Sequence, residues 1–186
     1  MTMSQVNATQ PVSDMPAGNE AETLLSTLDR IRSTFAWKCS GLDAAGMTAR
    51  LGPSTVTLGG LVKHLALVED HYFTALLGGG DMPEAWHNYG GEDWEWRSAA
   101  DDTPEDLLAL WRGAVDRSRA ATAAALARDG LDAITVKPRH GNEVVNLRPI
   151  IADLIEEYAR HTGHADLIRE SVDGLVGEDP PPDWPL

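Results

Sequence analysis

The stretch from Ile150 to Glu170 constrains this chain most, because it predicts an amphipathic helix with polar groups inside its apolar face. At 3.6 residues per turn, the apolar positions gather on one side: Ile150, Leu154, Tyr158, Ala165, Ile168 and Val172. Glu157 and His161 lie near the middle of that stripe, within about 40° of each other around the helix axis. A buried carboxylate is costly unless it is paired or bound to a metal. The Glu-x3-His spacing puts two ligand atoms one turn apart, which suits a single divalent ion.

Composition limits the partners that a chain like this can have. A length of 186 residues is enough for one domain with its own core. The formal net charge of −14 argues against nucleic acid and against an anionic membrane surface, since both need clustered Lys and Arg. No apolar run reaches the ~20 residues of a membrane span, and no secretory signal is visible. We therefore expect a cytoplasmic protein. Cys39 is the only cysteine, so no disulfide can form within the chain.

Four segments carry the apolar periodicity of amphipathic helices. They run over residues 19–37, 57–77, 103–128 and from about 149 to the residue before Gly174. Four helices with short to medium connections predict an all-α four-helix bundle. The expected organisation is a disordered arm over 1–18, the bundle over 19–174 and a Pro-rich tail over 175–186.

The connections between these segments differ in character. Residues 40–56 are broken by Gly and Pro and predict a loop. Residues 81–102 lack a helical or strand period and mix Trp and Tyr with acidic residues. A loop of this length is often functional, and its Trp residues either dock it on the bundle or contact a substrate. Residues 134–136 and 144–147 flank a turn and predict a short β-hairpin before the last helix.

A metal site in a bundle needs a further ligand from another helix. His64 is the best candidate, because it lies inside the second predicted helix beside its apolar face. His2Glu is a known catalytic zinc set that leaves a position open. His71 and His164 are reserve ligands, and His164 alternatively hydrogen-bonds a ligand or shuttles protons near the metal. The competing interpretation is a hydrogen-bonded core histidine at His64, together with a Glu157 carboxylate paired to Arg148 or Arg160.

Two segments, Thr57–Glu69 and Glu156–Glu170, resemble the DinB/YfiT-like metalloenzyme superfamily, and the second points to its actinobacterial-type branch. The resemblance covers roughly residues 20–175. It implies a divalent metal, zinc or alternatively nickel, held by His64, Glu157 and His161. Many members have His at the position of Glu157, whereas the related mycothiol-dependent maleylpyruvate isomerases have Glu. Related sequences often have His where this chain has Asp153, so the role of that position does not carry over.

Characterised relatives are S-transferases and isomerases that use mycothiol or bacillithiol. The resemblance therefore implies a metal-dependent S-transferase that activates a low-molecular-weight thiol against an electrophile. On this hypothesis His164 or Glu69 moves protons, and Arg148 or Trp86 contacts the thiol. Two alternatives stay open. One is a metal-dependent hydrolase or isomerase that uses metal-bound water, and the other is a non-catalytic, metal-binding stress-response dimer. A homodimer is also compatible with the enzymatic hypotheses.

Overall fold

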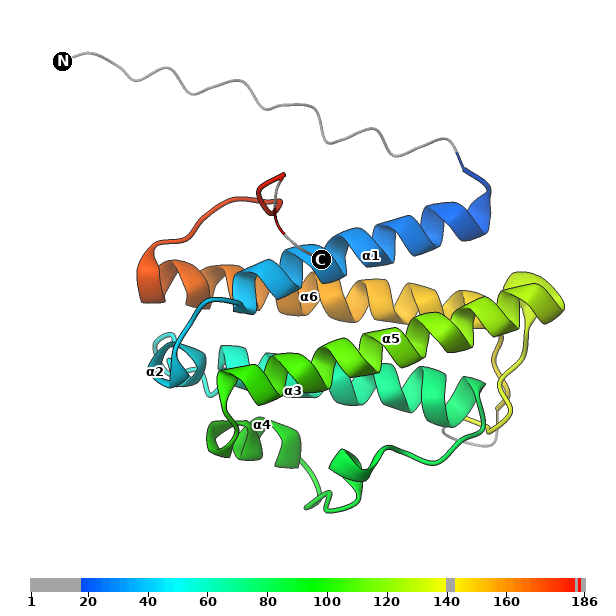
Figure 1. The fold of residues 1–186 in the computed structure, drawn as a ribbon, viewed down its shortest axis with the longest axis horizontal. Helices are drawn as coiled ribbons and strands as arrows, with labels where there is room; N and C mark the ends of the chain where they lie inside the picture. Colours follow the sequence, from blue (N-terminus) through cyan, green and yellow to red (C-terminus); the bar gives the residue numbers. More distant parts are fainter. Residues whose placement is uncertain (1–17, 140–142, 183, 185–186) are drawn as a thin grey trace, which may run out of the picture.

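Long helices dominate the structure, a computed structural model that describes residues 18–139, 143–182 and 184. The long elements are α1 (Glu20–Cys39), α3 (Leu58–Glu69), which continues as the π-helix η1 (Asp70–Leu77), α5 (Pro104–Asp129) and α6 (Leu147–Asp173) (Figure 1). Short elements connect them: α2 (Ala44–Thr48), η2 (Glu84–Trp86), α4 (Trp94–Ser98), η3 (Ala99–Asp101) and η4 (Gly130–Asp132). The described residues include no sheet, which confirms the all-α prediction.

The helix ends follow local sequence signals. The Asn19 side chain accepts a hydrogen bond from the Glu22 amide, and the Glu22 carboxylate accepts one from the Asn19 amide, so α1 begins with a capping box. Thr103 caps α5 ahead of a proline at the first helical position. Gly174 adopts a left-handed conformation with φ 80° and ends α6. α6 begins at Leu147 rather than near Pro149.

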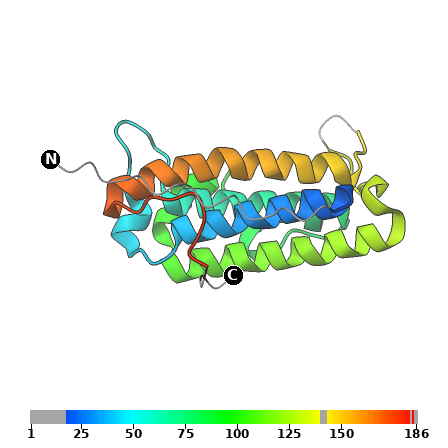
Figure 2. The same ribbon diagram turned by 90° about the horizontal axis from the view of Figure 1, so that it is seen from above.

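The long helices pack as a bundle around one apolar core. α1 packs along α6, and α3 with η1 packs along α5. Seen from above, α1 runs alongside α6 (Figure 2). α3 also contacts α6, and this pairing is the one that matters for the site. The largest side chains with almost no exposed area include Phe35, Leu58, Leu65, Phe73 and Tyr158.

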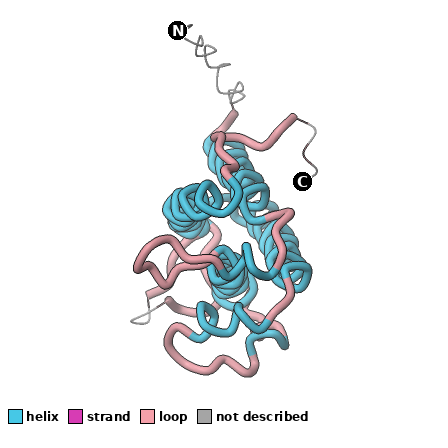
Figure 3. Tube along the Cα trace, turned by 90° about the vertical axis from the view of Figure 1, so that its left-hand side faces the viewer, coloured by secondary structure: helices cyan, strands magenta, loops and turns pink. Residues whose placement is uncertain are grey.

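Two segments that we predicted to be loops contain short helices. Residues 44–48 form α2, which is capped by the Asp43 side chain accepting from the Gly46 amide. Residues 81–102 contain η2, α4 and η3, and they lie along one side of the bundle at the bottom of Figures 1 and 3. Helices of three to five residues are too short to produce a detectable apolar period, which is why the pattern missed them.

The predicted hairpin has a single β-bridge among the described residues, between Ile134 and Asn146. The Thr135 amide donates to the Val145 carbonyl over 2.8 Å. The side chains on either side are exposed, with Ile134 and Val144 each 58% accessible, so little apolar burial supports a longer ladder. Its turn, including His140, lies outside the described residues, as does the N-terminal arm over residues 1–17.

Candidate metal centre

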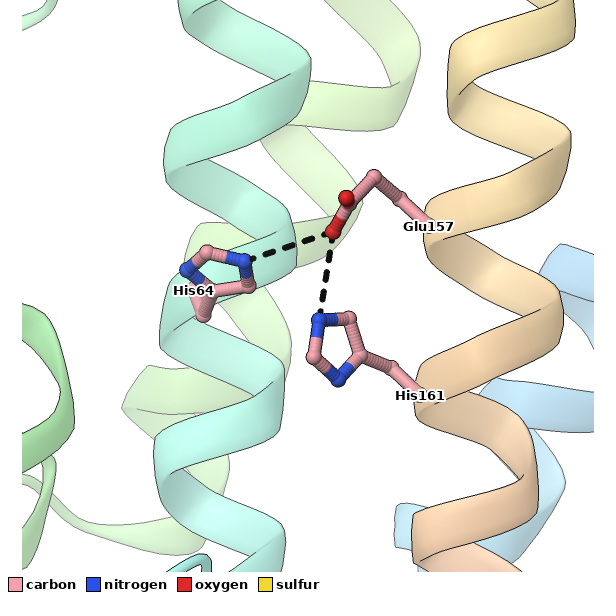
Figure 4. A group of neighbouring side chains, drawn as sticks. All are labelled: His64, Glu157 and His161. Carbon is pink, nitrogen blue, oxygen red and sulfur yellow. Dashed lines mark ion pairs between the residues drawn. The ribbon is translucent and has the colours of Figure 1, made fainter.

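Three side chains from two helices converge between α3 and α6 (Figure 4). His64 points from α3 toward Glu157 and His161 on α6. The Nε2 atoms of His64 and His161 lie 3.6 and 3.2 Å from the same Glu157 oxygen, Oε2. One ligand atom from each residue falls within 4.8 Å of the others. Two imidazole nitrogens and a carboxylate oxygen at this separation can share a single divalent ion.

The chemistry of these donors fits such an ion. Two His and one Glu form a known catalytic zinc set. The pKa of His161 is lowered to about 4, mainly by burial and also by the neighbouring His64, while Glu157 acts in the opposite direction. The imidazole is therefore neutral at physiological pH, which is the form that coordinates a metal.

The three side chains line a cleft of about 790 Å³. Its other walls are largely apolar and aromatic, with two arginines: Leu67, Val68, His71, Tyr72, Met82, Trp86, Tyr89, Arg139 and Arg160. A cleft of this volume accommodates a small organic molecule, and a few polar groups in mostly apolar walls are typical of such sites. His71, expected only as a reserve ligand, therefore faces the cleft without belonging to the ligand group.

The short helix α4 contacts His64 at its other ring nitrogen and on its ring face. Glu95 Oε1 lies 3.2 Å from His64 Nδ1. The Trp96 ring stacks on the His64 ring with centroids 4.5 Å apart and planes 23° from parallel. Both residues belong to the segment 81–102, which was predicted to dock on the bundle or contact a substrate, but neither was expected to contact a ligand. The signal available was the run Asp93-Trp-Glu-Trp96, in which acids alternate with large aromatics inside an otherwise aperiodic segment.

The predicted proton-transfer residues occupy different surroundings. His164 is exposed, and its Nδ1 lies 3.3 Å from Nδ1 of His161, the nitrogen that does not face Glu157. Glu69 has no exposed area and is not among the cleft-lining residues. Its two oxygens accept 2.7 Å hydrogen bonds from Arg32, and Oε1 also accepts one from the Tyr158 hydroxyl.

The two residues predicted to contact the thiol also lie in different places, one at the cleft and one away from it. Trp86 is buried, lines the cleft and donates its indole N–H to Asp70 over 2.8 Å. Arg148 does not line the cleft. It lies in the first turn of α6 and pairs with Glu20 at 2.7 Å and Asp132 at 2.9 Å.

Arginines pair with two acids on α6, Glu157 and Asp153. Arg160 reaches Oε1 of Glu157 at 3.3 Å, which leaves Oε2 facing the two histidines. Asp153 pairs with Arg139 at 2.7 Å. The interpretation of Glu157 as an Arg160 partner and its interpretation as a ligand are therefore compatible, because they use different oxygens.

Fold and site together define an all-α bundle with a His2Glu group on the wall of a cleft. The chain belongs to the mycothiol S-transferase family, which it matches over residues 23–174, and this confirms the suspected DinB/YfiT-like relationship. A comparison with curated proteins gave no match. No described helix is both long and apolar enough to cross a membrane.

Proposed function

We propose that this protein is a metal-dependent S-transferase that joins a low-molecular-weight thiol of the mycothiol type to an electrophilic small molecule. The supporting observation is the convergence of His64, Glu157 and His161 within 4.8 Å on the wall of a 790 Å³ cleft. These three residues would hold zinc, or alternatively nickel. Family membership supports mycothiol as the thiol.

A bound divalent ion would lower the pKa of a coordinated thiol and so supply a thiolate at neutral pH. In the overall reaction the thiol loses its proton, its sulfur forms a bond to the electrophilic carbon, and the leaving group departs with its electron pair. The cleft residues contribute by orienting the two reactants and excluding water. Trp86 and Tyr72 line the cleft and would serve this purpose, and His164 would orient His161 through its second ring nitrogen.

A thiol nucleophile would come from outside the protein, because the protein's own cysteine is unsuitable. Cys39 is 1% exposed and lies at the end of α1 among core residues. Burial raises the pKa of its thiol far above the usual range, so no thiolate forms there at neutral pH.

The test compares two histidine substitutions in the purified protein. We expect His161→Ala to lose bound zinc, measured by elemental analysis, and to lose conjugation of mycothiol to a haloalkyl probe. The matched control is His87→Ala, because His87 is exposed and outside the cleft lining. Conjugation that continues in metal-free His161→Ala would contradict the proposal.

A second arm of the experiment separates the transferase from the hydrolase or isomerase alternative. The transferase turns over only when thiol is present, whereas metal-bound water would act in thiol-free buffer. Turnover of the probe without thiol would therefore contradict the transferase and favour the hydrolase or isomerase alternative. The cytoplasmic location and a homodimer stay predictions, testable by fractionation and by light scattering.

A further inference from the structure

Glu95 is a buried acid in the connecting segment between η1 and α5. It lies on α4, and only 6% of its surface is exposed. Removing a carboxylate from water is costly unless hydrogen bonds or an opposite charge compensate for the lost hydration. The partners of Glu95 therefore indicate why an acid is kept there.

Two other buried acids have a different kind of partner to compensate their charge. Glu69 pairs with Arg32, and Asp70 pairs with Arg117, so each faces a permanently charged guanidinium. The ion-pair partner of Glu95 is the imidazole of His64, at 3.2 Å. The other Glu95 oxygen accepts a hydrogen bond from the Tyr89 hydroxyl at 3.4 Å.

The Glu95 contact determines which nitrogen of His64 carries the proton. An ionised carboxylate can only accept hydrogen bonds, so Nδ1 of His64 must be the donor. In the neutral imidazole the remaining nitrogen, Nε2, then has a free lone pair. That nitrogen faces Oε2 of Glu157 at 3.6 Å (Figure 4). A lone pair and a carboxylate oxygen that face each other repel unless a proton or a metal ion lies between them, and a bound divalent ion would fill this place.

Packing fixes the ring in this orientation. The stacked Trp96 ring limits rotation of His64 about its side-chain bonds. Trp96 and Glu95 are neighbours on α4, so one short helix sets both the ring plane and the proton position of His64.

We propose that Glu95 is a positioning residue for the metal centre, which it serves by holding His64 with Nδ1 protonated and Nε2 directed at the ion. This inference rests on the proposed metal-dependent function. A carboxylate that accepts the second N–H of a metal-bound histidine orients the ring and raises its basicity, and its loss typically weakens metal binding about 10–100-fold. The acidic and aromatic segment 81–102 thereby contributes to metal affinity without supplying a ligand.

The experiment measures zinc affinity of the full-length protein by competition with a chromophoric chelator. We expect Glu95→Gln to bind zinc about 10–100-fold more weakly than the wild type. The matched control is Glu92→Gln, an exposed acid in the same segment, which should bind like the wild type. Equal affinities in Glu95→Gln and wild type would overturn the positioning role and leave the proposed function intact. If the wild type itself binds no zinc, both fail.

A second measurement does not depend on how the variant folds. Nitrogen NMR of the zinc-loaded wild type reports the protonation of each imidazole nitrogen. The proposal requires a His64 ring with a proton on Nδ1 and the metal on Nε2. The opposite arrangement, with Nδ1 ligated and Nε2 protonated, would contradict it.

Discussion

Acidic side chains in two regions of this protein have different partners. At the junction of α3 and η1, Glu69 and Asp70 have no exposed area and bind Arg32 and Arg117 through paired hydrogen bonds of 2.7–2.9 Å. At the candidate metal centre, the partly exposed Glu157 faces two imidazoles, one of which has a pKa lowered to about 4. In the first region a guanidinium binds both oxygens of each acid. In the second, Arg160 pairs with Oε1 of Glu157 at 3.3 Å, and Oε2 faces the two imidazoles.

This difference separates a structural cluster from a binding site. The Glu69 cluster extends through Tyr158, whose hydroxyl accepts from the Trp111 indole at 2.8 Å, and it lies inside the core. Each buried polar group there has a protein partner, as stability requires. The donors at Glu157, in contrast, lie beside a cleft open to small molecules. Although Glu69 and His64 belong to the same helix, only His64 faces the cleft.

Removing the metal should produce the largest effect. It should abolish the activity at the candidate metal centre and leave the Glu69 cluster unchanged. We expect chelation to lower conjugation about 100-fold or more, because a metal contributes several kcal/mol to stabilising charge in the reaction. Added zinc should restore the rate. Circular dichroism should show the helices unchanged, since the Arg-paired cluster keeps the core intact. If the chelated protein keeps its full conjugation rate, the His64, Glu157 and His161 group does not act as a metal site in this reaction.

Breaking the Arg-paired cluster should affect stability instead. Glu69→Ala removes the buried partner of Arg32 and leaves its guanidinium paired only with the partly exposed Asp29, so we expect a loss of about 3–5 kcal/mol in the free energy of unfolding, measured in urea. The folded fraction should still bind zinc stoichiometrically. The exposed acid Glu170 in α6 provides the control substitution, Glu170→Ala, with little change expected. A stable Glu69→Ala protein with abolished conjugation would instead support the predicted proton-transfer role.

A smaller change tests whether the cluster acts as a network. Tyr158→Phe removes the hydroxyl that donates to Glu69 and accepts from Trp111. We expect a loss of about 1–3 kcal/mol in the free energy of unfolding, because a buried indole N–H is left without its partner. Thermal unfolding checks the stability, and zinc content should match the wild type. A loss of zinc would show that the two regions are coupled.

The smallest effect is expected at Arg148, outside both regions. Its pairs with Glu20 and Asp132 are exposed, and such pairs contribute little to stability. We expect Arg148→Ala to leave the melting temperature and the KM for the thiol almost unchanged. An increased KM for thiol would show that Arg148 contacts the thiol, as the resemblance first suggested.

The sequence predicted the parts of this protein that depend on local order. Helical periodicity identified the long helices, and Asn19, Thr103 and Gly174 marked their ends, because capping involves only neighbouring residues. The same periodicity put Glu157 and His161 on one face, and it made His64 the best candidate for a partner. The structure brings these three together.

Tertiary structure decided everything that depends on contacts between distant residues. The partner of His64, Glu95, is 31 positions away on a helix of five residues that leaves no periodic trace. The partner of Glu69, Arg32, is 37 positions away on α1. In the sequence, nothing distinguishes Glu95 from Glu69. Only the packing of α4, α1 and α6 around α3 gives one a guanidinium and the other an imidazole, and the charge of that partner separates the structural acid from the one at the site.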